Sequence, residues 1–140
     1  MNNEIEYLIA IEEIKSLKAK YFRCIDTKDW QGLSECFTDD LDADFQEAPG
    51  PHTQSKAEYI AMIQDALKDA KTVHHGHMPE IKIDSANSAS GIWAMEDIVR
   101  LPGLTLQGWG YYHEEYLKVD SCWLISKIKL TRLILDVTET

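Results

Sequence analysis

The chain has 140 residues, a length typical of a single domain with its own hydrophobic core. Hydrophobic residues make up 44% and charged residues 27% of the chain, which is ordinary for a soluble globular protein. The net charge of −10 argues against a nucleic-acid partner, because binding phosphates requires a basic surface. The N-terminal MNNEIEY has neither the basic nor the apolar region of a signal peptide, and no apolar run reaches membrane-spanning length. We therefore expect one cytoplasmic domain over residues 1–140, with no nucleic-acid or membrane partner.

Before residue 71, the spacing of apolar residues and the turn signals predict mainly helices. The expected elements are an amphipathic helix from Ile5 to about Cys24, a short helix over Trp30–Phe37, a strand over Leu41–Ala48, and a third helix from Ser55 to about Ala70.

After residue 71, the pattern changes to long extended segments joined by short turns. The expected strands are Thr72–Asp84, Ala89–Leu101, Thr105–Val119 and Cys122–Leu135. Short connections between consecutive strands predict an antiparallel meander. Gly108 and Gly110 share one face of the third long strand, where they permit strong bending and leave space above the sheet. The chain is therefore expected to be α+β, with a curved sheet that wraps around the helices and encloses a pocket.

Two charged residues fall on strand faces that are otherwise apolar. In Ile92–Leu101 the alternate residues are large and apolar, and Asp97 shares their face. In Leu124–Ile134 the apolar face likewise carries Arg132. A buried carboxylate requires a paired or hydrogen-bonded partner, and such groups concentrate at functional sites. Asp97 is therefore either part of a polar site inside a hydrophobic cup or one half of a structural ion pair with Arg132.

The segment Val73–Pro79 has three histidines in four residues. Strand alternation places His75 and His77 on one face and His74 on the other. A metal site is disfavoured, because no acidic or cysteine ligand lies at a supporting spacing. A histidine beside an inward carboxylate on the adjacent strand instead predicts a His–Asp pair, in which the carboxylate orients the imidazole as a general base. For each histidine taken alone, a hydrogen-bonded group without catalytic function is the simpler interpretation.

Tyr21 and Asp26 lie at the end of the first helix and in the turn that follows it. Tyr21 belongs to the buried stripe, and a buried phenol requires a partner for its hydroxyl. Asp26 is explained locally as a turn former or as a partner of a nearby cation. We also place Trp30, His77, Met95 and Tyr112 along the predicted pocket, although aromatic side chains are core or interface residues by default.

Four stretches together resemble a known family. They are Ile11–Phe37 (IEEIKSLKAKYFRCIDTKDWQGLSECF), HHGHMPEIKID, GIWAMEDIVR, and the pair formed by Trp123 and Arg132. They resemble the SnoaL-like branch of the nuclear transport factor 2-like superfamily from about Ile5 to Leu135. The resemblance is closest to the bile acid 7α-dehydratases, and scytalone dehydratase is a more distant relative.

The resemblance implies a cone-shaped fold, in which a strongly bent mixed or antiparallel sheet wraps around three helices and the active site lies in the open mouth. It places the dehydratase tyrosine on Tyr21, its following aspartate on Asp26, the base histidine on His74, the carboxylate partner of that base on Asp97, and the arginine on Arg132. The connection between the second and third long strands is shorter than in the bile acid enzymes. Neither a bile acid nor a coenzyme A thioester is therefore implied as substrate.

These residues predict a lyase or isomerase that needs no cofactor and no metal. It would act on a small apolar oxygenated ring compound, such as a steroid-like or polyketide-like molecule. His74, held by Asp97, would remove a proton, and Tyr21, assisted by Asp26, would donate a hydrogen bond. Arg132 would balance the carboxylates or bind an anionic group of the substrate. Isomerisation uses the same residues, and a ligand-binding or oligomer-forming domain without turnover is the alternative function. The family resemblance also implies a homo-oligomer, either a dimer or a trimer.

Overall fold

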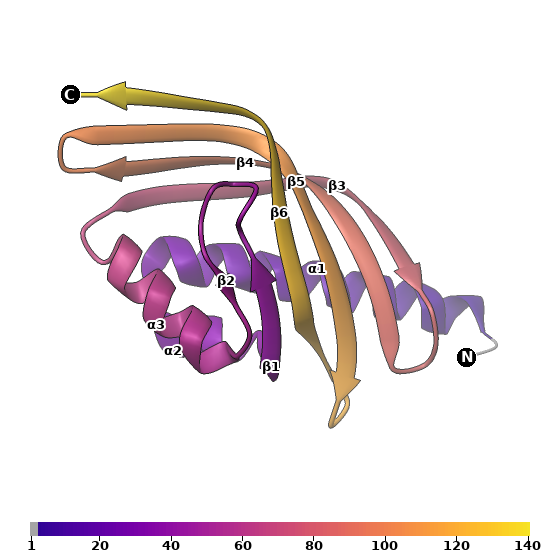
Figure 1. Ribbon diagram of the computed structural model, residues 1–140. Coiled ribbons are helices and arrows are strands. Elements are labelled where there is room, and N and C mark those ends of the chain that lie inside the picture. Colours follow the sequence, from indigo (N-terminus) through magenta and orange to yellow (C-terminus); the bar gives the residue numbers. More distant parts are fainter. Residues whose placement is uncertain (1–2) are drawn as a thin grey trace.

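The computed structural model describes residues 3–140, which form three helices and six strands (Figure 1). In chain order these are α1 (Glu4–Thr27), α2 (Trp30–Ser34), β1 (Phe37–Asp44), β2 (His52–Thr53), α3 (Lys56–Leu67), β3 (Lys71–Ile83), β4 (Ser88–Leu101), β5 (Leu104–Val119) and β6 (Cys122–Glu139). None of the helices within residues 3–140 combines the length and the apolar character needed to cross a lipid bilayer.

The strands form one six-stranded sheet in the order β2-β1-β6-β5-β4-β3. Strands β3 to β6 pair antiparallel with their neighbours in the chain, as the short turns predicted. Strand β1 pairs parallel with β6, which makes the sheet mixed. Figure 1 shows the long strands bending over the helices, which lie against the concave face. The predicted α+β fold, with a bent mixed sheet around three helices, is confirmed.

Several element boundaries differ from the prediction, and the strand expected over Leu41–Ala48 is β1 at Phe37–Asp44. The segment expected to be helical up to Phe37 leaves the helix at Ser34, because Phe37 pairs with Ile125 of β6 and starts strand β1. Helix α1 continues to Thr27 and ends at Lys28, whose φ of 59° closes the helix. Asp26 therefore lies in the last turn of α1 and not in the turn that follows it.

A bulge changes which residues of β6 face the helices. Gly110 pairs with Arg132 and Trp109 pairs with Ile134, so Leu133 has no counterpart on β5. Because an extra residue reverses the side-chain alternation, Ile134 is 53% exposed, although it was predicted on the same face as Arg132. Beyond the bulge, Leu135 takes the concave side.

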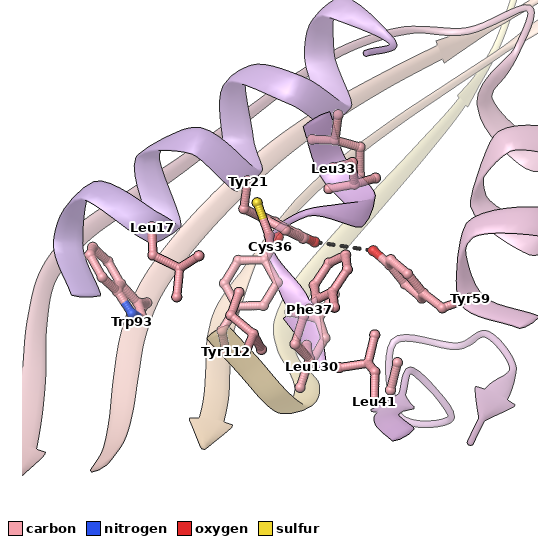
Figure 2. Packing of buried hydrophobic residues seen from close by; sticks show 14 of the residues in the cluster. Leu17, Tyr21, Leu33, Cys36, Phe37, Leu41, Tyr59, Trp93, Tyr112 and Leu130 are labelled. Carbon is pink, nitrogen blue, oxygen red and sulfur yellow. Dashed lines mark hydrogen bonds between the residues drawn. The ribbon is translucent and has the colours of Figure 1, made fainter. Parts of the chain in front are cut away.

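The hydrophobic core lies between α1 and the concave face of the sheet (Figure 2). Helix α1 contributes the buried Ile14, Leu17 and Tyr21 from its apolar stripe. Tyr112 from β5 packs edge-on against Tyr21, with ring centroids 6.0 Å apart. These contacts fix α1 across the sheet, and with it the position of the last helical turn.

A buried ion pair also connects α1 to β5. Lys18 Nζ lies 2.6 Å from Glu114 Oε2, and both side chains are fully buried. Glu114 Oε1 accepts a hydrogen bond of 2.7 Å from Tyr116, whose oxygen accepts one of 2.9 Å from Trp93. Burial lowers the pKa of Lys18, and the charge of Glu114 opposes that shift. Each of the two buried groups therefore has a counterion within the core.

The variant Lys18→Met should lower the free energy of unfolding by about 3–5 kcal/mol, because it leaves the Glu114 carboxylate buried without a counterion. The double variant Lys18→Met/Glu114→Gln should recover much of that loss. Lys20→Met is the matched control, since the exposed pair of Lys20 with Glu35 should contribute at most about 1 kcal/mol. Urea denaturation measures the free energy of unfolding of all three variants. Equal losses for Lys18→Met and Lys20→Met would contradict the role of the buried pair.

Candidate active site

The side chain of His74 is held by Asp26. Strand alternation directs Thr72 and His74 of β3 toward the concave side, where the last turn of α1 presents the Asp26 carboxylate. Asp26 Oδ1 accepts hydrogen bonds from Thr72 Oγ1 at 2.9 Å and from His74 Nδ1 at 2.7 Å. Asp26 Oδ2 accepts the backbone N–H of His74 at 2.9 Å. Three hydrogen bonds therefore fix both the carboxylate and the plane of the imidazole.

This contact also selects the tautomer of His74. A carboxylate can only accept, so Nδ1 carries the hydrogen and Nε2 of the neutral ring keeps a lone pair. Nε2 lies 3.9 Å from Asp97 Oδ2, which is too far for a hydrogen bond. The ring is only 8% exposed. His74 therefore presents an oriented basic nitrogen next to Asp97.

Asp97 is buried and paired with Arg132. The two guanidinium NH₂ groups donate to the two carboxylate oxygens of Asp97 at 2.8 and 3.0 Å. Arg132 Nε donates to the carbonyl oxygen of Ala48 at 2.9 Å, which ties the loop after β1 to β6. The bidentate geometry is the strongest form of this ion pair.

Gly108 makes the ion pair of Asp97 and Arg132 possible. It lies on β5, opposite Asp97 and between β4 and β6. A Cβ at position 108 would lie 1.9 Å from the Arg132 NH₁ nitrogen and 2.8 Å from Asp97 Oδ1. The guanidinium therefore crosses β5 through the space that a side chain would fill.

The three polar groups line one end of a cavity of about 450 Å³. His74, Asp97 and Arg132 supply the polar part of its wall, and the rest is apolar. Apolar side chains come from the loop after β1, from α3, and from the ends of β4 and β6: Phe45, Met62, Ile63, Val99, Leu135 and Val137. The arrangement suits an apolar molecule held against one basic nitrogen.

Tyr21 lies apart from this cavity. Its hydroxyl is 3.4 Å from that of Tyr59, and both phenols are buried in the core (Figure 2). Burial raises the pKa of Tyr21 well above its ordinary value, so the phenol stays protonated. Asp26, which was expected to assist Tyr21, binds Thr72 and His74 instead, so that assignment is wrong.

The expected carboxylate partner of His74 is also corrected. Asp97 was assigned that role from the adjacent strand, and it does lie opposite His74 in the register. Its oxygens are taken by Arg132, however, and Asp26 reaches the imidazole because α1 extends through Thr27. Asp97 and Arg132 thus form the ion pair that was the alternative interpretation, at the edge of the cavity.

The four further residues predicted along the pocket lie outside the cavity wall. Met95 and Tyr112 are buried in the core, and Trp30 packs against it. His77 points to the convex side of the sheet, where it is 3.2 Å from Glu96. Thr72 and the apolar residues near Val137 were not identified from sequence. Gly108 was predicted to leave space above the sheet, and the guanidinium of Arg132 lies in that space.

Comparisons with known proteins agree with this architecture. A sequence model of the SnoaL-like domain family matches residues 6–129. A putative scytalone dehydratase from Novosphingobium aromaticivorans has a similar structure, with a TM-score of 0.87 and 18% identity over 99% of this chain and 92% of that one. A type 2 hexachlorocyclohexane dehydrochlorinase (LinA) superposes with a TM-score of 0.86 and 16% identity, over 97% of this chain and 93% of that one. The Kfla4162 protein from Kribbella flavida gives a TM-score of 0.81 and 22% identity, over 89% and 91%. At these identities the structures establish the shared fold.

Gly108→Ala should lower the free energy of unfolding by about 3–5 kcal/mol, because the displaced guanidinium leaves the Asp97 carboxylate buried and unpaired. Gly103→Ala is the control: Gly103 has a φ of 78° and no atom near its Cβ position, so only backbone strain of about 1–2 kcal/mol is expected. Chemical denaturation measures the free energy of unfolding of both variants. A loss for Gly108→Ala no greater than that of the control would contradict the proposed crossing of Arg132 over β5.

Asp26→Ala should disturb the tautomer of His74. Alanine removes both acceptor oxygens, so the ring and the backbone N–H of His74 both lose their partner. Ring ¹⁵N chemical shifts at a pH where the imidazole is neutral should report the Nδ1–H form in the parent chain and a mixture in the variant. Identical shifts in both proteins would show that Asp26 does not select the tautomer.

Proposed function

The chain belongs to the SnoaL-like domain family, and we propose that it is a lyase that removes a proton and a leaving group from a small apolar ring compound without a cofactor. The observation that carries the proposal is the oriented Nε2 of His74 at the polar end of an otherwise apolar cavity. Such a nitrogen is a general base for a carbon acid held against it. The similar dehydratase and dehydrochlorinase folds support an elimination.

In the proposed reaction, His74 Nε2 takes a proton from a carbon of the ring. The electrons of that C–H bond form a carbon–carbon double bond, and the leaving group departs from the adjacent carbon with its own bonding pair. Asp26 acts as a positioning residue: its carboxylate accepts from Nδ1 and stabilises the imidazolium that forms. Three hydrogen bonds anchor the Asp26 carboxylate, two of them from His74, and they keep the imidazole from rotating away from the substrate.

Arg132 is suited to stabilise negative charge that develops during this step. Its contacts with Asp97 and Ala48 engage three of the N–H groups of the guanidinium, which carries about five in total. The remaining donors can face a carbonyl or a departing group in the cavity. Because Asp97 already balances the charge of Arg132, an anionic substrate gains little there. We therefore favour an uncharged substrate.

The position of Tyr21 restricts the leaving group. The phenol bonds to Tyr59 in the core, so it does not supply a proton inside the cavity. The leaving group must then depart as a stable anion, such as a halide, or receive its proton back from the His74 imidazolium. The second route permits loss of water from a ring alcohol on the same side as the abstracted proton. Returning the proton to another carbon would give an isomerase with the same residues.

Ligand binding without turnover is the second candidate function. The position of Tyr21 outside the cavity favours this function, because the cavity then lacks the expected proton donor. Deuterium exchange in D₂O distinguishes the lyase from a binding protein. A base exchanges the acidic proton of a bound compound even when no group leaves, whereas a binding protein leaves the C–H bonds of that compound unchanged.

His74→Gln should lower turnover by about 10²–10⁴-fold, because the amide cannot take up a proton. Halogenated and hydroxylated cyclohexanes and cyclohexenones form the substrate panel, with product formation followed by mass spectrometry and deuterium uptake by NMR. The control is His113→Gln, which changes an exposed histidine 3.2 Å from Thr131. It should retain full activity.

Turnover that survives His74→Gln would overturn the proposed base. A panel member that binds in calorimetry, and that shows neither product nor deuterium uptake, would instead assign the cavity to binding alone.

A further inference from the structure

A second cluster of histidines lies on the other side of the sheet from His74. His75 and His77 alternate with His74 along β3 and point to the convex face. Glu96 on β4 pairs directly with His75 across the ladder. Its Oε1 lies 3.4 Å from His75 Nδ1 and 3.2 Å from His77 Nε2. The three side chains are 44–59% exposed, so an ion can reach them from solvent.

We infer that His75, His77 and Glu96 form a binding site for a divalent transition metal such as Zn²⁺. Two imidazole nitrogens and one carboxylate oxygen are a donor set that zinc prefers, and three protein ligands leave a fourth position for water. All three ligand atoms lie within 4.8 Å of one another. Tetrahedral bonds of about 2.0–2.1 Å place ligand atoms about 3.3 Å apart. The distances from Glu96 Oε1 to His75 Nδ1 and His77 Nε2, 3.4 and 3.2 Å, agree with that spacing.

The backbone holds these ligands in place. The ladder between β3 and β4 is regular from Lys71, opposite Arg100, to His77, opposite Ala94. The register then shifts between His77 and Glu80, and Met78 has a φ of 39°. A bulge re-aims the side chains beside it, and here it follows His77 directly. Two ligands on one strand and one on its partner therefore need only side-chain rotation to close around an ion.

Glu96 contacts both imidazoles through the same carboxylate oxygen, Oε1. A metal ion would replace these two contacts with bonds to the same three atoms. Because β3 is the edge strand of the sheet, the ion would clamp it to β4. The site is separated from the cavity by the sheet, and the inference does not depend on the proposed lyase activity.

The test is a calorimetric titration of the untagged, EDTA-treated and dialysed chain with ZnCl₂. One ion per chain should bind in the micromolar range, and the melting temperature should rise with zinc concentration. His75→Ala, His77→Ala and Glu96→Gln should each weaken binding by about tenfold or more. All three positions are exposed, and circular dichroism verifies the fold of each variant. Co²⁺ in place of Zn²⁺ should give the visible absorption that is typical of tetrahedral coordination.

His113→Ala and His52→Ala are the matched controls, because both change an exposed or half-exposed histidine outside the cluster. They should bind zinc as the parent chain does. The inference is overturned by the absence of saturable micromolar binding, by an affinity that Glu96→Gln leaves unchanged, or by a loss of binding in either control.

Discussion

The carboxylate of Asp26 is the contact on which the site depends. It accepts one hydrogen bond from Thr72 and two from His74, and so joins the last turn of α1 to the first residues of β3. Strand β3 has a neighbour on one side only. An edge strand held in this way keeps its inward side chains in register with the helix, and the direction of the His74 lone pair follows from that register.

The ion pair of Asp97 and Arg132 has both a structural and a functional consequence. Its bidentate bonds connect β4 to β6 across the bare backbone of Gly108, next to the register shift between β5 and β6. The same pair forms part of the polar end of the cavity. A structural ion pair and a site residue were alternative interpretations of Asp97, and the geometry makes them compatible.

Strand alternation was enough to place side chains on faces, but not to choose their partners. It correctly put Asp97 on the buried face of its strand, and His74 on the face of β3 opposite to His75 and His77. The partner of His74 depended on where α1 ends, which apolar spacing defines only to within a turn. Glu96 lies 19–21 residues from the histidines it contacts, so only the register of β3 with β4 brings them together. The parallel pairing of β1 with β6 likewise has no local signal.

The charges around the cavity bear on the proposed transfer of a proton to His74. Among the described residues of this cluster, Asp26 and Asp97 supply two carboxylates and Arg132 supplies one cation, so the carboxylates outnumber the cation while His74 is neutral. In apolar surroundings an uncompensated charge is costly, and its attraction for a nearby cation is strong. A proton transferred to His74 removes that imbalance beside Asp26. In the proposed step, the carboxylates would stabilise the imidazolium product more than the neutral ground state, which is the requirement for a base that acts on a weakly acidic carbon.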